Sequence, residues 1–132
     1  MSEPQTAPLP LRWVRAHGLR SLTPWHLIEN DEMSAGFRRE YVLEVSGGSL
    51  PERDMLPFAH RQDCDDVAGF VVDNGEVREA VIEIHLTYRG GPEIPGYPQA
   101  KRFASFWEWL KSAIDDSADW CGEEELADLK EP

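Results

Sequence analysis

Residues 67–88 of this 132-residue chain read VAGFVVDNGEVREAVIEIHLTY and decide the fold. Val67 to Val72 is apolar on both faces, which is typical of a strand covered on both sides. Asn74-Gly75 predicts a tight hairpin, because both residues tolerate positive φ. From Arg78 to Tyr88 apolar and polar residues alternate with the period of a strand. Its expected apolar face holds Ala80, Ile82, Ile84, Leu86 and Tyr88, and its wetter face holds Glu79, Glu83, His85 and Thr87.

The segments on either side add a short strand, a loop and a helix. Leu56 to Ala59 is short and apolar, and Pro57 favours an edge strand. Six Gly and Pro residues in 89–100 predict a long loop, and loops of that length are candidates for binding or mobility. Ser105 and Glu108 form a capping-box pattern at the start of a final helix. Its expected buried stripe is Phe106, Trp107, Leu110 and Ile114, which leaves Trp109 half-exposed.

The N-terminal part predicts helices. Met33, Phe37, Tyr41 and Val45 recur every four residues, so a helix is expected from Asp31 to about Glu44, although 41–45 could instead be a strand. Thr23-Pro24 predicts another helix start, and Leu11 to His17 a short helical segment that stops at Gly18. We expect a disordered segment at 1–10, one domain at 11–120 and an acidic tail at 121–132. The fold class is α+β, with an antiparallel sheet flanked by N-terminal helices and a C-terminal helix.

The charge balance restricts the possible partners. The chain has 13 Lys and Arg against 25 Asp and Glu, a net charge of −12, and residues 103–132 account for −7 of it. Nucleic acid and anionic membranes are disfavoured because both need clustered basic residues. No apolar run approaches the roughly 20 residues that span a bilayer, and 1–10 lacks a signal-peptide pattern, so a cytoplasmic location is expected.

The densest polar cluster, His60 to Asp66, has the wrong spacing for a metal. Counted from Asp63, a calcium loop would need Gly at the sixth position and Glu at the twelfth, where Ala68 and Asn74 stand. Zinc sites use His and Cys pairs, whereas Cys64 and Cys121 are isolated and are expected as reduced thiols. We therefore expect turn-forming aspartates, no metal and no cofactor. No hydrolase elbow, P-loop or dinucleotide motif occurs, so the chain is not expected to be an enzyme.

The stretch LPFAHRQDCDDVA at 56–68 resembles a segment of the SUKH superfamily, which includes a fungal cell-wall assembly regulator and many bacterial immunity proteins. TPWHLI at 23–28 and FASFWEWL at 103–110 are similar to flanking parts of that family. Cys64 and Gly69-Phe70 depart from its pattern, as does the long Gly- and Pro-rich segment at 86–100. The resemblance implies the same α+β fold and a role as an antidote to a toxin, often a nuclease.

Charge and resemblance together predict a non-catalytic module that binds a basic protein, in particular a toxin domain, and occludes its basic surface. The expected contact residues are Asp63, Asp65, Asp66, Glu93, Trp109, Asp116, Asp119 and Trp120. Two alternatives stay open: a regulatory scaffold without a toxin partner, and a divalent-metal-dependent hydrolase that uses the Asp63–Asp66 cluster.

Overall fold

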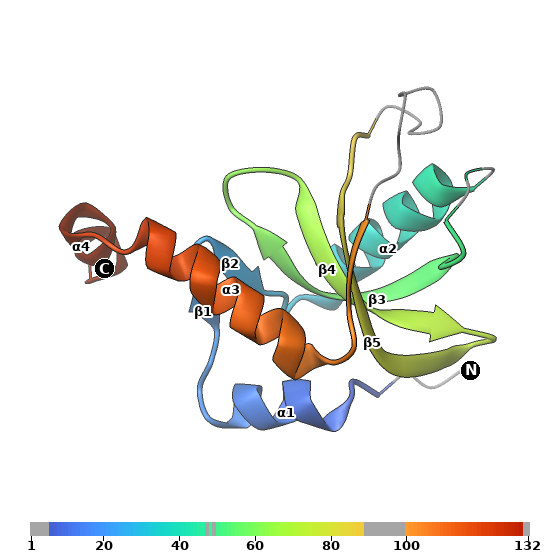
Figure 1. Cartoon of the computed structure of the whole chain (residues 1–132), viewed down its shortest axis with the longest axis horizontal. Helices are drawn as coiled ribbons and strands as arrows, with labels where there is room; N and C mark the ends of the chain where they lie inside the picture. The colour runs from blue at the N-terminus through green and yellow to red at the C-terminus, as the bar shows by residue number, and fades with distance from the viewer. Residues whose placement is uncertain (1–5, 47, 49, 89–99, 131–132) are drawn as a thin grey trace.

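The predicted hairpin forms the centre of the molecule. The computed structural model describes residues 6–46, 48, 50–88 and 100–130 (Figure 1). Strands β4 (Asp66–Asp73) and β5 (Glu76–His85) pair antiparallel, with Asp73 opposite Glu76. The two residues between them have positive φ, 52° at Asn74 and 78° at Gly75. This left-handed conformation suits Asn and Gly, so the hairpin prediction is confirmed.

The other strands add to both sides of the hairpin in chain order. The sheet runs β1 (Ser21–Leu22), β2 (Trp25–Leu27), β3 (Asp54–Arg61), β4, β5 and β6 (Ala100–Phe103), and all neighbours are antiparallel. Helices cover both faces (Figure 1). The α+β fold class is therefore confirmed.

Each face of the sheet has its own apolar core. Helices α1 (Leu9–Ala16) and α3 (Phe106–Trp120) pack on one face, around Trp25, Phe58 and Phe70. Helix α2 (Asp31–Val45) packs on the other face, where Tyr41 and Val45 meet the second core. Neighbouring residues of β5 point to opposite cores, as Val81 and Ile82 do, because strand side chains alternate.

Two of the predicted helices begin where local signals place them. Asn30 caps α2, its side-chain oxygen accepting hydrogen bonds from the backbone N–H groups of Glu32 and Met33. The segment 41–45 is helical and not a strand. Ser105 caps α3 by accepting from the Glu108 N–H at 3.3 Å. The Glu108 carboxylate does not return to the cap, because it binds Lys111 at 3.1 Å.

The buried stripe predicted for α3 is confirmed at Phe106 and Leu110, which pack in the core, and is wrong at Trp107 and Ile114. Phe106, Trp109 and Ala113 are buried, whereas Trp107 is 43% exposed and Ile114 is 50% exposed. The spacing 106, 109, 113 also follows one face of a helix, and contact with Trp25 and Phe58 selects that face.

Three local predictions fail because contacts with distant parts of the chain override them. Thr23-Pro24 starts no helix: it joins β1 to β2, and Trp25 pairs with Arg61 of β3. Pro57 is not on an edge, since β3 lies between β2 and β4, with a register shift between Pro57 and Ala59. Glu83, expected on the wetter face, is 7% exposed because Trp109 covers it.

The ends of the chain also differ from the prediction. Helix α1 begins at Leu9, inside the segment expected to be disordered, and Pro10 is tolerated in its first turn. The start of that segment, 1–5, lies outside the described residues, as does most of the predicted loop, 89–99. The acidic tail contains helix α4 (Glu123–Lys130), which lies beyond the end of α3 (Figure 1). Among the described helices none has the length and apolar composition needed to cross a bilayer.

Candidate functional site

The connection between β3 and β4 carries three of the predicted contact residues, and Arg61 fixes one of them. The Arg61 guanidinium binds Asp63 through two hydrogen bonds, Nε to Oδ1 at 2.8 Å and Nη2 to Oδ2 at 3.0 Å. This pairing lowers the pKa of Asp63 below its usual value. Arg61 also lies 3.6 Å from the Asp116 carboxylate and 5.8 Å from the centroid of the Trp25 ring. The connection is therefore tied to α3.

Asp116 has a structural role. Its carboxylate accepts a hydrogen bond from the Trp25 indole at 2.9 Å, and Trp25 is buried. The predicted contacts Asp63 and Asp116 thus meet around Arg61, and a guanidinium already balances part of their charge. Asp65 is exposed, and its side chain has no hydrogen-bond or ion-pair partner among the described residues.

Asp66 lies beside residues that the sequence analysis did not connect with it. It is directly opposite His85 in the β4–β5 register, and His85 Nδ1 is 2.8 Å from Asp66 Oδ1. Cys64 joins them, so that a thiol, a carboxylate and an imidazole offer atoms that all lie within 4.8 Å of one another. Zinc was not expected because His60 and Cys64 stand singly and not in pairs at zinc-site spacing, whereas strand pairing brings His85 to Cys64 from 21 residues away. Burial, and then the nearby Asp66 and Asp63, raise the pKa of the Cys64 thiol.

Trp109 is not a surface contact, which corrects its prediction as a binding residue. It is 1% exposed and packs edge-on against Trp25 and Phe58. Its indole donates to Glu83 at 3.2 Å, and Lys101 lies 3.7 Å from the same carboxylate. Burial raises the pKa of Glu83, and the charge of Lys101 partly offsets that effect.

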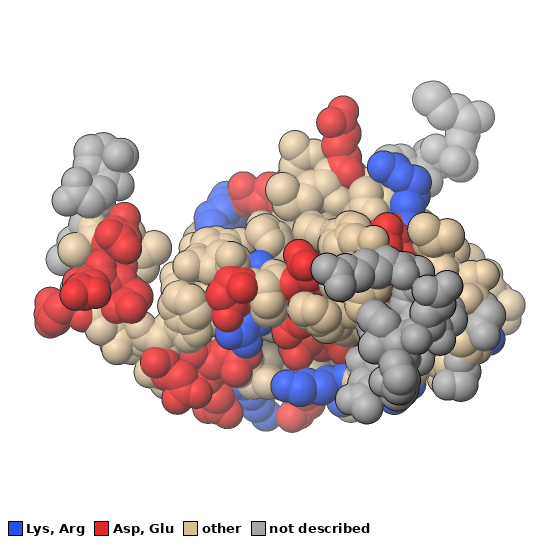
Figure 2. Space-filling view, turned by 90° about the horizontal axis from the view of Figure 1, so that it is seen from above, with Lys and Arg blue, Asp and Glu red and all other residues tan. Residues whose placement is uncertain are grey.

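The remaining predicted contact residues lie at the end of α3 or in a segment outside the described residues. Asp119 is exposed, Trp120 is half-buried, and Glu93 lies outside the described residues. With Asp119 belong Asp115 on α3 and the acids of α4. We call this group the acidic end; it comprises Asp115, Asp119, Glu123, Glu124, Glu125 and Asp128. Figure 2 shows acidic side chains over α4 and the adjacent part of the molecule.

The exposed tryptophans are ones that the sequence analysis did not select. Trp13 is 56% exposed and Trp107 43%, and with His17 they line a hollow of about 420 Å³ between α1 and α3. No local signal separates Trp107 from Phe106 and Trp109, because all three are large aromatic residues within one turn of α3.

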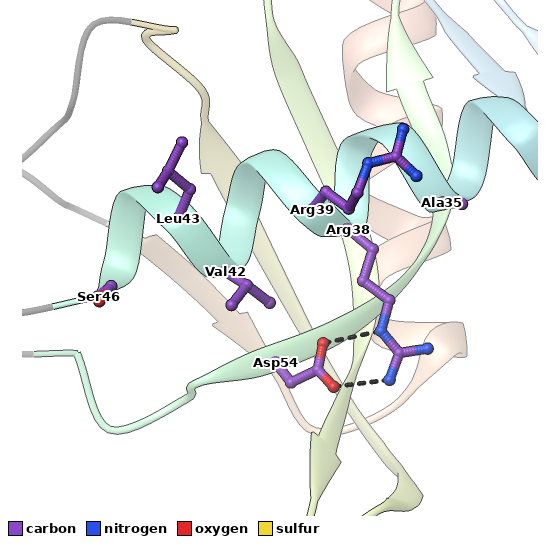
Figure 3. A pocket seen from close by; sticks show the side chains of 7 residues that line it. All are labelled: Ala35, Arg38, Arg39, Val42, Leu43, Ser46 and Asp54. Atoms are coloured by element: carbon purple, nitrogen blue, oxygen red, sulfur yellow. Dashed lines mark hydrogen bonds and ion pairs between the residues drawn. The ribbon is translucent and has the colours of Figure 1, made fainter.

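A hollow of about 570 Å³ lies along α2 (Figure 3). Val42 and Leu43 give it exposed apolar walls, and Arg38 crosses to Asp54 through hydrogen bonds of 2.8 and 2.6 Å. Because Asp54 is held by that guanidinium, the hollow offers contact surface and no free carboxylate for acid–base chemistry.

Comparison with known proteins gives no match: no family model, curated protein or solved structure is significantly similar to this chain.

Proposed function

We propose that this chain is a non-catalytic protein-binding module whose acidic end occupies the basic surface of a partner, and that the partner is a toxin domain which it neutralises. The observation that carries the proposal is the placement of Asp115 and Asp119, exposed near the C-terminal end of α3.

These two positions are unfavourable for the helix itself. The C-terminal end of a helix carries a partial negative charge and is stabilised by basic residues, yet the last turn of α3 has none. Asp115 and Asp119 are also four residues apart, a spacing at which like charges repel. Residues 112–129 hold seven Asp and Glu and no Lys or Arg. Acids that act against helix stability are expected where a surface serves an interaction outside the chain.

The acids of α4 increase the negative electrostatic potential of the acidic end, but by themselves they are weaker evidence for a binding role. Glu123, Glu124 and Glu125 occupy the first turn, where a negative charge favours the helix. Together with Asp115 and Asp119 they form a surface of one sign, which speeds association with a basic protein and selects against acidic ones.

The toxin part of the proposal rests on the resemblance of 56–68 to the SUKH superfamily. A nuclease toxin is basic where it holds phosphate, so an acidic protein seated there blocks substrate without any chemistry. This chain departs from the SUKH pattern in that stretch and at 86–100, so its partner is inferred from its own surface and not from the family.

A toxin domain is expected to be encoded beside this chain's gene, and the test is co-expression with that domain. We expect survival of the cells and a stable complex that weakens as salt rises, because exposed charges more than about 10 Å apart are screened at 0.1 M salt. Asp115→Asn/Asp119→Asn should slow association roughly tenfold at low salt.

The matched control is Glu76→Gln/Glu79→Gln, on the β4–β5 hairpin far from α4 (Figure 1), which changes the net charge equally. It should leave the association rate nearly unchanged. A complex that forms without protecting cells would replace the toxin assignment by a regulatory scaffold. Equal effects of the two double variants would remove the acidic end from the interface.

A further inference from the structure

The Cys64, Asp66 and His85 side chains come from two rigid strands and one turn. Asp66 begins β4 and His85 ends β5, and the register places them directly opposite one another. Cys64 stands two residues before Asp66, on the connection from β3. The three donor atoms lie within 4.8 Å of one another. An ordinary surface ion pair explains Asp66 with His85, but it gives no role to the thiol.

We propose that Cys64, Asp66 and His85 form a zinc site with an open fourth position. Thiolate, imidazole and carboxylate are the ligands that Zn²⁺ takes in proteins, whereas Mg²⁺ and Ca²⁺ take oxygen alone. Tetrahedral bonds of about 2.0–2.3 Å put neighbouring donor atoms about 3.3–3.6 Å apart. His85 Nδ1 and Asp66 Oδ1, now 2.8 Å apart, would open by about 0.5 Å, and the more widely spaced donors would close by at most about 1.5 Å. The exposed Cys64 can make that movement while the strand pair stays in place.

The protons balance in a simple way. Zn²⁺ binds Nδ1 of the neutral imidazole; where Nδ1 carries the proton towards Asp66, that proton passes through solvent to Nε2, so His85 keeps its one proton. The thiol loses its proton to water and binds as a thiolate. No oxidation or reduction is involved.

The surroundings favour a dication and leave space beside it. Asp63, Asp65 and Glu83 are further carboxylates close to the three ligands in the sequence or along the strand. Arg61 pairs with Asp63 and Lys101 with Glu83, so among the described residues Asp65 supplies the uncompensated charge. A hollow of about 240 Å³ borders Asp66 and His85, and Glu83 and Lys101 also line it. A water molecule or a small anionic ligand can take the fourth position from that side, the open arrangement of reactive zinc sites.

The probe is Co²⁺, titrated into the full chain under a non-chelating reductant. A cobalt–thiolate bond absorbs in the near ultraviolet, and Zn²⁺ removes that absorption by displacement. We expect one equivalent of Co²⁺ bound and a higher melting temperature with Zn²⁺, because a ligand of the native state stabilises it.

Four variants decide the assignment. Cys64→Ser should abolish the thiolate absorption, and His85→Ala should weaken Co²⁺ binding at least about tenfold, the loss that even outer-shell partners of a metal cause. Cys121→Ser and His17→Ala, which alter an exposed thiol and an exposed His elsewhere, should leave both unchanged. Absence of the absorption in the unaltered chain, or its persistence in Cys64→Ser, overturns the proposal. Neither readout involves the acidic end or its partner.

Discussion

Glu44 has a fully buried carboxylate. It is 0% exposed, and both oxygens are used: Oε1 accepts from the N–H and hydroxyl of Thr87 at 2.8 and 2.9 Å, and Oε2 from the Tyr88 N–H at 3.0 Å. Burying a carboxylate is favourable only when such donors replace water. The hydrogen bonds of Glu44 therefore fix α2 to Thr87 and Tyr88, which follow β5. No local sequence pattern predicts the contact between Glu44 and Thr87, because the two residues are 43 positions apart.

Glu40, one turn before Glu44, should make stability depend on pH. Its hydrogen bond to Glu44, burial and the charge of Glu44 raise its pKa from 4.5 to about 7. The folded state therefore binds the proton more tightly than the unfolded state. The contribution is fully present below pH 4.5 and is lost as pH rises through about 7. Glu40→Gln keeps a donor towards Glu44 and loses no proton, so its melting temperature should exceed that of the unaltered chain at pH 8 and match it near pH 4.

The measurement is thermal unfolding by circular dichroism at several pH values. Glu79→Gln, at an exposed position of β5, is the control and should show a constant difference. If the Glu40→Gln difference is also constant between pH 4 and 8, the shared proton is excluded.

Gly69 marks a close approach between β3 and β4. A Cβ there would lie 2.5 Å from the Met55 sulfur and 2.8 Å from the Leu56 carbonyl oxygen, which strand pairing holds in place. Gly69→Ala should lower the free energy of unfolding by about 1–3 kcal/mol, as overpacking does. Gly36→Ala in α2, whose Cβ would meet nothing closer than 3.8 Å, should raise it by about 0.5–1 kcal/mol. Urea unfolding of both gives the comparison, and changes of the same sign would contradict it.

At the scale of the elements, local residues determine where α2 and α3 begin and where the β4–β5 hairpin turns. Asn30 and Ser105 cap their helices by accepting hydrogen bonds from backbone N–H groups a few residues further on. Asn74-Gly75 forms the turn of the hairpin through its positive φ angles. These ends could be predicted from sequence for that reason. The strands β2 and β6 carry no such signal, because β2 is placed by β3 and β6 by β5, both far along the chain, and β1 pairs only with β2.

Ser105 provides the element-scale test. Its hydroxyl accepts from the Glu108 N–H, and loss of such a cap costs about 0.5–2 kcal/mol. Ser105→Ala should lower the free energy of unfolding by that amount in urea. Ser112→Ala, within the same helix, should leave it unchanged or slightly higher, because Ala is the better helix former. Equal values for the two variants would place the start of α3 elsewhere.

The candidate sites show the same division between local and distant causes. The turn at Asp63–Asp66 and the acidic bias of 103–132 are visible in the sequence. The pairing of Cys64 with His85 needs the β4–β5 register, and the burial of Trp109 needs Trp25 and Phe58 to select one face of α3. Trp107 and Trp109 are equally apolar, so composition could not choose between them.

At the scale of the whole molecule, the charge is separated from the core. Helix α4 stands at one end (Figure 1), and its leucines, Leu126 and Leu129, are 44% and 63% exposed. Among the described residues of 121–129 only Glu125 is partly covered, so this end adds little to the packing of the sheet and its helices.

Removal of 122–132 should therefore preserve the fold and weaken the proposed binding. We expect the melting temperature measured by calorimetry to change by less than about 4 °C, the shift that about 1 kcal/mol produces in a domain of this size. Association with the basic partner should slow, since four acids of the acidic end are lost. A fall in melting temperature of 10 °C or more would show that α4 packs against the domain.

The chain-order sheet also sets a route for folding. The β4–β5 turn leaves two residues between its strands, as the β1–β2 turn does, but its strands are 8 and 10 residues long against 2 and 3. This hairpin therefore gains the most pairing for a small loss of chain entropy and should form first. Strand β3 can then zip onto β4 across a short connection, whereas β2 must wait for α2 and β6 for the segment after β5. Because each new strand meets only its predecessor or successor, no strand has to be threaded between two others. We expect rapid assembly that spreads outward from Asn74-Gly75.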